Sequence, residues 1–204
     1  RIMEDHGFSI RRKPVLSKLR FVQMDEFYPI DPRQKNSFYD YVLNFYIKGF
    51  GLDPSKTMLM NADRINLLDG LHYSEVFPDT RIDLSLRNRE AMNPQEKIQQ
   101  ASIFRIDNWC TGYENRIRES GGIGFFLGGI GPDGSLAFNT RGSDHNSTTR
   151  LTATNFESQA SSAGDLGGIE VSRKRLVLTI GLGTLTYNPD CAAIVFAAGE
   201  AKAQ

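Results

Sequence analysis

The sequence predicts an α/β fold in three layers, an open and mostly parallel sheet with helices on both faces. Short apolar runs alternate with helix-like segments, which is the pattern of such folds. Two late runs, RLVLTIG and CAAIVFAA, lack polar alternation, as strands covered on both faces do. The 204 residues are 40% hydrophobic, enough to bury a sizeable core. We therefore expect residues 1–204 to form a single domain.

The first predicted unit is a strand followed by a helix. Apolar residues cluster in LRFVQM, residues 19–24, and the acidic pair Asp25 and Glu26 comes at the C-terminal end of this strand. Ser37 can cap the following helix, which we expect to end at Gly49 and Gly51. Its apolar face would hold Phe38, Tyr41, Val42, Phe45 and Tyr46.

The middle of the chain predicts a strand, a long loop and a long helix. TMLM, residues 57–60, reads as the strand, and the polar, irregular residues 61–93 read as the loop. From Pro94 to Glu119 apolar residues recur every three or four positions, which predicts an amphipathic helix that begins with proline and ends before Gly121. Its buried face would hold Ile98, Ser102, Ile106, Trp109, Tyr113 and Ile117.

Three further strands are expected in the C-terminal half. They are GIGFFL at residues 122–127, RLVLTIG at 175–181 and CAAIVFAA at 191–198. The small, polar residues 158–168, SQASSAGDLGG, predict a mobile segment.

Composition excludes several classes of partner. Lys plus Arg and Asp plus Glu both number 24, so no basic excess favours nucleic acid. The longest apolar run, CAAIVFAA, is too short to span a membrane, and the charged opening RIMEDHGFSIRRK predicts no signal peptide. Cys110 and Cys191 have no metal-ligand spacing, so we expect neither zinc nor another metal. The sequence therefore indicates a cytoplasmic protein that binds a small molecule.

The loop GGIGPDGSLAFN, residues 128–139, contains a literal G-x-G-x-x-G. A dinucleotide-binding loop of the Rossmann type needs a helix after its glycines, so that the helix N-terminus faces the pyrophosphate. Here a β-like and then polar stretch follows Gly134, and Asp133 would repel the anion. The loop therefore argues against NAD, although a plain glycine-rich strand exit would leave Asp133 unexplained.

Five segments, read together, resemble the glucosamine-6-phosphate deaminase family, which is related to the 6-phosphogluconolactonases. They are MDEFYPI from Met24, YENRIRESGGIGFFLGGIG, FFLGGIGPDGSLAFN, LTIGLGTL from Leu178, and FAAGEAK ending at Lys202. The resemblance implies a Rossmann-like sheet and the conversion of glucosamine 6-phosphate and water to fructose 6-phosphate and ammonia. It also implies that the chain lacks the family's first strand with its phosphate loop and the C-terminal part of the family fold.

The resemblance assigns roles to two carboxylates. Asp25 matches the aspartate that transfers a proton between C2 and C1 of the sugar, a step that needs one base within reach of both carbons. From its position alone, Asp25 reads more readily as a solvated acid at a strand end. Asp133 matches the aspartate of the ring-opening relay.

Two members of that relay differ in this chain. Ser135 and Thr140 stand where the family has a histidine and a glutamate, and a serine hydroxyl does not titrate near neutrality. Ser135, Asn139 and Thr140 are therefore expected to bind substrate, and His145, in the segment that matches the family's lid, is a candidate replacement for the missing histidine. A loop histidine that is merely solvated is the alternative for His145.

Lys202 matches the family's phosphate-binding lysine, and the resemblance implies no organic cofactor. We expect a sugar phosphate as the ligand and a homo-oligomer as the assembly. A sugar-phosphate sensor without catalysis is the rival hypothesis: the altered relay favours it, whereas the two retained aspartates favour an enzyme.

Overall fold

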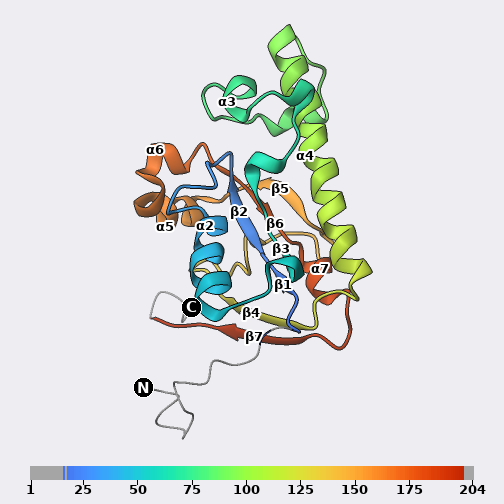
Figure 1. Cartoon of the computed structure of the whole chain (residues 1–204). Coiled ribbons are helices and arrows are strands. Elements are labelled where there is room, and N and C mark those ends of the chain that lie inside the picture. The colour runs from blue at the N-terminus through green and yellow to red at the C-terminus, as the bar shows by residue number, and fades with distance from the viewer. Residues whose placement is uncertain (1–15, 17, 200–204) are drawn as a thin grey trace, which may run out of the picture.

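The computed structural model describes residues 16 and 18–199, which fold into short strands flanked by helices. In Figure 1 β2, β5 and β6 lie between α4 on one side and α2, α5 and α6 on the other, whereas β4 and β7 run along the bottom of the view. The elements in chain order are β1 (Phe21–Val22), β2 (Asp25–Tyr28), α2 (Phe38–Tyr41), η1 (Val42–Gly49), η2 (Pro54–Lys56), β3 (Thr57–Met58), η3 (Ala62–Arg64), η4 (Leu68–Gly70), α3 (Tyr73–Val76), η5 (Leu84–Arg87), α4 (Pro94–Glu119), β4 (Phe125–Gly129), β5 (Arg150–Ala153), α5 (Phe156–Leu166), α6 (Ile169–Ser172), β6 (Leu176–Thr179), α7 (Leu182–Thr186) and β7 (Ala192–Phe196). The predicted α/β class is confirmed.

The described strands form three small sheets. β1 pairs with β3 and β4 pairs with β7, both in parallel, as the sequence predicts. The third sheet, in the order β2, β6, β5, is antiparallel, with Asp25 and Arg150 both opposite Thr179. An apolar run does not give the direction of a strand, so this antiparallel sheet could not be read from the sequence. The prediction that CAAIVFAA is covered on both faces is wrong for the described residues, because β7 is exposed along its length.

α4 is the longest helix among the described elements, and its bounds match the prediction. Asn93 caps it, because its side chain accepts a hydrogen bond from the Glu96 amide at 2.9 Å, and Pro94 occupies the first turn. The predicted face is confirmed: Ser102, Ile106, Tyr113 and Ile117 are buried, and Ile98 and Trp109 pack against the core. The Tyr113 hydroxyl donates to the carbonyl oxygens of Gln23 and Met58, both at 2.8 Å, and so ties α4 to the strands.

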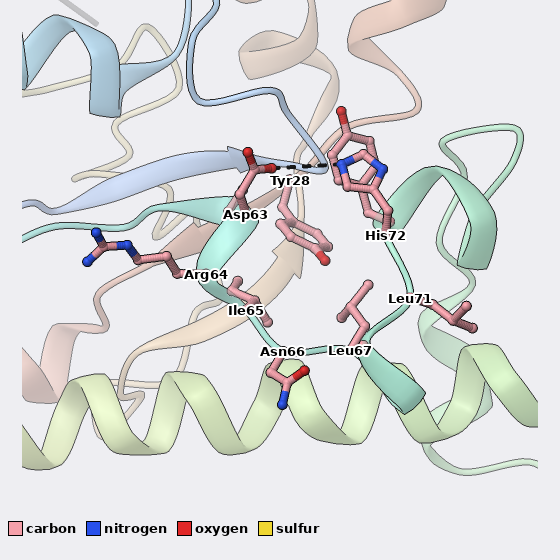
Figure 2. A pocket seen from close by; sticks show the side chains of 11 residues that line it. Tyr28, Asp63, Arg64, Ile65, Asn66, Leu67, Leu71 and His72 are labelled. Carbon is pink, nitrogen blue, oxygen red and sulfur yellow. Dashed lines mark ion pairs between the residues drawn. The ribbon is translucent and has the colours of Figure 1, made fainter.

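Residues 61–93 are more ordered than the predicted loop. They contain η3, η4, α3 and η5, and they bury apolar side chains against α4, among them Ile65, Leu67, Val76, Phe77 and Leu86. With Tyr28 they line a cavity of about 220 Å³ (Figure 2), into which the sequence places no site residue. Helical turns of three or four residues carry no periodic pattern, which is why the sequence suggested a loop.

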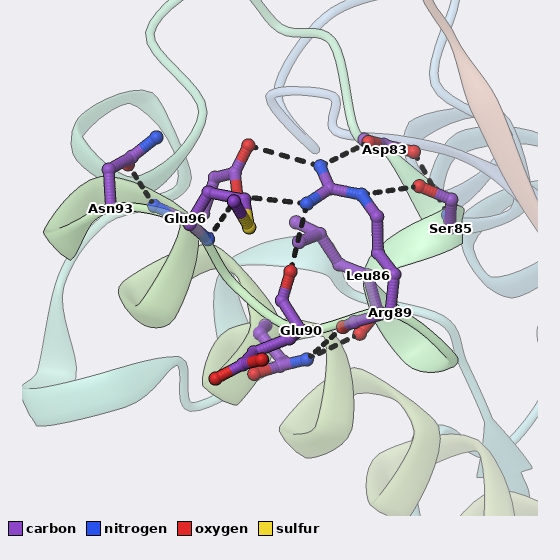
Figure 3. A network of polar contacts seen from close by, with 9 residues as sticks. Asp83, Ser85, Leu86, Arg89, Glu90, Asn93 and Glu96 are labelled. Atoms are coloured by element: carbon purple, nitrogen blue, oxygen red, sulfur yellow. Dashed lines mark hydrogen bonds and ion pairs between the residues drawn. The ribbon is translucent and has the colours of Figure 1, made fainter.

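Arg89 attaches the end of this segment to α4. Its guanidinium contacts Asp83 at 2.8 Å and Glu96 at 2.9 Å, and it donates to the Ser85 hydroxyl at 2.9 Å (Figure 3). Glu96 also accepts a hydrogen bond from the Met92 amide at 2.7 Å. The network fixes the first turn of α4, so residues 83–96 form one unit.

Residues 158–168, for which the sequence predicts mobility, are mostly helical in the structure. Most of them lie in α5, which Asn155 caps by accepting a hydrogen bond from the Ser158 amide at 3.0 Å. The helix ends at Gly167, whose φ of 88° is the left-handed conformation that favours glycine. Alanine and serine leave only a weak apolar stripe, and Leu166 is the fully buried residue of the helix.

Candidate functional site

Asp25 begins β2 and lines a large groove beside it. The side chain is half-buried, and among the described residues its carboxylate accepts no hydrogen bond. Burial, and next the charge of Glu26, raise the pKa of Asp25 to about 7. A carboxyl group with this pKa can accept and return a proton near neutral pH, as proton transfer between two carbon atoms requires.

The backbone around Asp25 is fixed by its neighbours. The Gln23 side chain donates to the Asp25 carbonyl oxygen at 2.8 Å and accepts from the Met60 amide at 3.0 Å. The Ile180 amide donates to the Met24 carbonyl oxygen at 2.9 Å. The carboxylate therefore projects from a rigid strand start, which favours a defined position for a catalytic group.

The groove that Asp25 lines has a volume of about 1040 Å³ and mostly apolar walls. Its lining includes Phe21 and Val22 of β1, Phe125 and Leu127 of β4, and side chains from α2 and η1. Asp25 and Arg20 supply the charges of this lining. Asp133, Ser135, Asn139, Thr140 and His145 do not line it, so the structure does not place the two predicted carboxylates in one cavity.

Asp133 lies in the turn after β4, with its oxygen atoms occupied. It accepts hydrogen bonds from the Ser135 hydroxyl at 2.7 Å, the Ser135 amide at 3.2 Å and the Asn155 side chain at 2.6 Å. Burial would raise the pKa of Asp133, but these hydrogen bonds outweigh it and hold the pKa below its usual value. Asp133 is therefore ionised at neutral pH and suited to accepting hydrogen bonds. The turn needs glycine at position 131, because a Cβ atom there would clash with Ser135 and Asp133.

Asn139 connects this turn to the end of β6, beside Asp25. Its amide nitrogen donates to the carbonyl oxygens of Leu136 at 3.0 Å and Ile180 at 2.9 Å. Its Oδ1 atom is buried and has no hydrogen-bond partner among the residues that the structure describes. Since Asp25 pairs with Thr179, which precedes Ile180, Asn139 and Asp25 lie at the same end of this sheet. A buried acceptor without a partner is costly and indicates a place for a donor.

The remaining predicted residues have no described partner in the site. Thr140 is half-buried and His145 is exposed, and no hydrogen bond of either side chain, to Asp25, Asp133 or any other group, occurs in the described part of the chain. Lys202 lies outside the described residues.

The LTIGLGTL motif packs closely against the segment that follows His145. The Gly183 amide donates to the Ser147 carbonyl oxygen at 2.8 Å, and a Cβ atom on Gly181 would collide with that carbonyl group. Glu114 of α4 binds the same region, because it accepts from the hydroxyl groups of Thr149 at 2.8 Å and Thr184 at 2.7 Å. These glycines therefore permit a close approach between chain segments, a packing role that the motif alone did not reveal.

Sequence reasoning missed the partners of the two carboxylates. Glu26 and Asn155 each contact residues distant in the sequence, and neither belongs to a recognisable spacing.

Within residues 16 and 18–199, no cluster of three or more His, Cys, Asp or Glu side chains could hold a metal ion. None of the helices described here is long and apolar enough to cross a membrane.

Comparisons with known proteins confirm the resemblance inferred from the sequence. The chain is 43% identical over 147 residues to a glucosamine-6-phosphate deaminase of Caenorhabditis elegans, covering 72% of the chain and 54% of that relative. It is 36% identical over 128 residues to the glucosamine-6-phosphate deaminase of Borrelia hermsii, covering 61% of the chain and 44% of the relative. The chain thus spans about half the length of the curated relatives it matches. No protein-family model matches it.

A solved structure shows the same fold. It is described as a monomeric glucosamine-6-phosphate deaminase and superposes with a TM-score of 0.60, covering 94% of this chain and 61% of that one. The sequence identity is 17%, so this comparison supports the α/β fold alone.

Proposed function

We propose that this chain forms the α/β part of a sugar-phosphate deaminase that converts glucosamine 6-phosphate and water to fructose 6-phosphate and ammonia. The observation that carries the proposal is Asp25, a half-buried carboxyl with no hydrogen-bond partner in the described structure and a pKa raised to about 7. The similarity to enzymes named for this reaction supports the same substrate class.

Asp25 acts as the base of the aldose-ketose step. In the open-chain sugar its carboxylate removes the C2 proton while O1 takes a proton from water, which gives an enolamine. The resulting carboxylic acid returns its proton to C1, which leaves an iminium group at C2, and hydrolysis of that group returns a proton to water. A group with a pKa near neutrality performs both transfers with little driving force lost in either direction. The amine then leaves C2 as ammonia while water supplies the carbonyl oxygen of the ketose.

Asp133 and its neighbours bind and orient the sugar. Asp133 is ionised, and its Oδ2 atom, which accepts one described hydrogen bond, from Asn155, can accept another from a sugar hydroxyl. Ser135 shares the network through Oδ1. The free Oδ1 of Asn139 accepts from a hydroxyl or ammonium group of the substrate. Thr140 is assigned to substrate binding, and Lys202 to the phosphate, where Lys202→Ala should raise KM far more than it lowers kcat.

The relay that opens the sugar ring is altered. Ser135 cannot transfer a proton as an imidazole does, and His145 is the nearest candidate along the chain for that role. We propose that turnover depends on the open-chain fraction of substrate unless His145 supplies the missing acid. Ser135→His should then raise kcat, and His145→Ala should lower it only if His145 has the role.

We propose that residues 1–204 are part of a single α/β domain. The apolar groove between β1 and β4 supports it, because two parallel strand pairs border the groove and neither facing edge hydrogen-bonds to another described strand. A strand carrying the phosphate loop would cover these apolar walls and complete the site beside Asp25. We also propose a cytoplasmic homo-oligomer, although the structurally similar deaminase is monomeric.

The rival function is a sugar-phosphate sensor, which the serine at position 135 favours. The two functions are separated by incubating the protein with glucosamine 6-phosphate and measuring ammonia release together with the melting temperature. An enzyme releases ammonia and is stabilised by the ligand. Stabilisation without ammonia release would support the sensor. If the protein neither releases ammonia nor is stabilised, both proposals are contradicted.

A further inference from the structure

Glu26, the residue after Asp25, is a fully buried carboxylate with four hydrogen bonds. Its Oε1 atom accepts from the amides of Phe27 at 2.9 Å and Phe38 at 3.1 Å. Its Oε2 atom accepts from the Ser37 hydroxyl and the Tyr39 amide, both at 2.7 Å. Three of these four donors belong to the start of α2 and its cap, so Glu26 clamps β2 to the helix.

The two adjacent carboxyl groups therefore differ in their surroundings. Consecutive residues of a strand point to opposite faces, so Glu26 meets α2 while Asp25 faces the groove. Burial raises the pKa of Glu26, but its four donors all favour the ionised form. Asp25 has no such donors among the described residues. On balance the pKa of Glu26 is still raised, because burial outweighs the four donors. These donors distinguish Glu26 from Asp25, and they favour Glu26 as the member of the pair that ionises first.

Few other charges bear on Asp25. The titratable and charged groups on the surrounding described elements are Tyr113 of α4, Tyr41 of α2, Tyr46 of η1, Arg20 before β1 and Arg150 of β5. Burial raises the pKa of Tyr113, so that this phenol is neutral at ordinary pH. Arg20 is exposed, and solvent screens its charge. Glu26 is the buried charge next to Asp25.

We propose that Glu26 is a positioning residue for the proton transfer by Asp25: it fixes the start of β2 against α2 and holds a buried negative charge on the adjacent residue, on the opposite face of the strand. The charge makes ionisation of Asp25 less favourable, which keeps Asp25 a strong enough base to remove a carbon-bound proton. The inference rests on the proposed function of Asp25, but its test requires no substrate.

The test is a carbon-13 NMR titration of the side-chain carboxyl groups, with Asp25→Asn and Glu26→Gln used to assign the two signals. In the unchanged chain, Asp25 should titrate at about 7, and Glu26 should remain ionised at that pH. In Glu26→Gln the Asp25 midpoint should fall, because a like charge is removed, but it should stay above 3.8, because burial, the larger cause of the raised pKa, remains. Glu26→Asp keeps the charge and should leave the midpoint close to that of the unchanged chain.

Glu114→Gln is the matched control. Glu114 is another buried carboxylate with several donors, including Thr149, Thr184 and Arg118, but it is not adjacent to Asp25. The Glu114→Gln variant should therefore have the same Asp25 midpoint as the unchanged chain.

The proposal is overturned if folded Glu26→Gln retains the original midpoint of Asp25, or if Glu26→Asp lowers that midpoint as much as Glu26→Gln does. Should Glu26→Gln not fold, the titration of Glu26 in the unchanged chain decides, and uptake of a proton by Glu26 at higher pH than Asp25 contradicts the proposal. A correct titration without ammonia release would contradict the proposed function alone.

Discussion

Replacing Asp25 with asparagine should stabilise the folded protein at alkaline pH. The folded pKa of Asp25 is about 7, against 3.8 for the free side chain. A raised pKa means that the folded state binds the proton more tightly than the unfolded state does. The stability that this proton contributes is fully present below pH 4 and is lost as the pH rises through 7.

The magnitude follows from the difference between the two pKa values. Each pH unit corresponds to about 1.4 kcal/mol, and the folded midpoint lies about two units above pH 5. Between pH 5 and pH 8 the unchanged chain should therefore lose about 3 kcal/mol of unfolding free energy that Asp25→Asn does not lose. Other titrating groups cancel when the two proteins are compared at the same pH.

Urea denaturation of both proteins at pH 5 and pH 8 measures this difference. Asp133→Asn is the control of opposite sign, because the pKa of Asp133 lies below its usual value and its carboxylate stabilises the protein at neutral pH. That contribution is lost as the pH falls through the folded pKa of Asp133. Parallel pH profiles for the unchanged chain and Asp25→Asn would refute the reasoning, because Asp25 would then ionise as freely as in the unfolded chain.

Three further predictions concern the turns, the cap and the ligand. Gly181→Ala should destabilise the protein by several kcal/mol in thermal denaturation, because the new Cβ atom would meet the Ser147 carbonyl group. Gly164→Ala, in the open interior of α5, should instead stabilise the protein by about 0.5 to 1 kcal/mol. Equal changes in stability for the two variants would argue against the close approach at Gly181. Asn155→Ala should cost about 1 kcal/mol as a lost helix cap and should also raise the pKa of Asp133 in an NMR titration, and a change in neither would contradict the hydrogen bonds described. A hexose 6-phosphate at millimolar concentration should raise the melting temperature and NAD should not, and the reverse result would restore the dinucleotide hypothesis.

The sequence predicted the elements that carry strong local signals. The bounds of α4 followed from a proline start and a regular apolar face, and Ser37 was correctly expected to cap α2 because a serine side chain can accept a hydrogen bond from a helix amide. Asp25 was singled out because it matches an aspartate of the family that the five segments resemble, whereas its position alone favoured a solvated acid at a strand end. Its raised pKa depends on burial and on Glu26, which only the folded arrangement reveals.

What the sequence could not predict involves contacts between distant segments. The turns in residues 61–93 are too short for periodicity, and α5 is built from small residues that resemble a linker. The bonds from Asn155 to Asp133 and from Ser37 to Glu26 join residues 22 and 11 positions apart. No spacing rule links such pairs. The hydrogen bonds that set the pKa values of Asp133 and Glu26 could therefore be found only in the structure.

The most direct test of Asp25 as the proton-transfer base is solvent exchange at C2 of the substrate. The protein is incubated in deuterium oxide with glucosamine 6-phosphate, and deuterium at C2 and ammonia are followed by NMR. The unchanged protein should incorporate deuterium and release ammonia, while correctly folded Asp25→Asn should do neither. Exchange that persists in Asp25→Asn would show that another group moves the proton, and the assignment of Asp25 would be wrong.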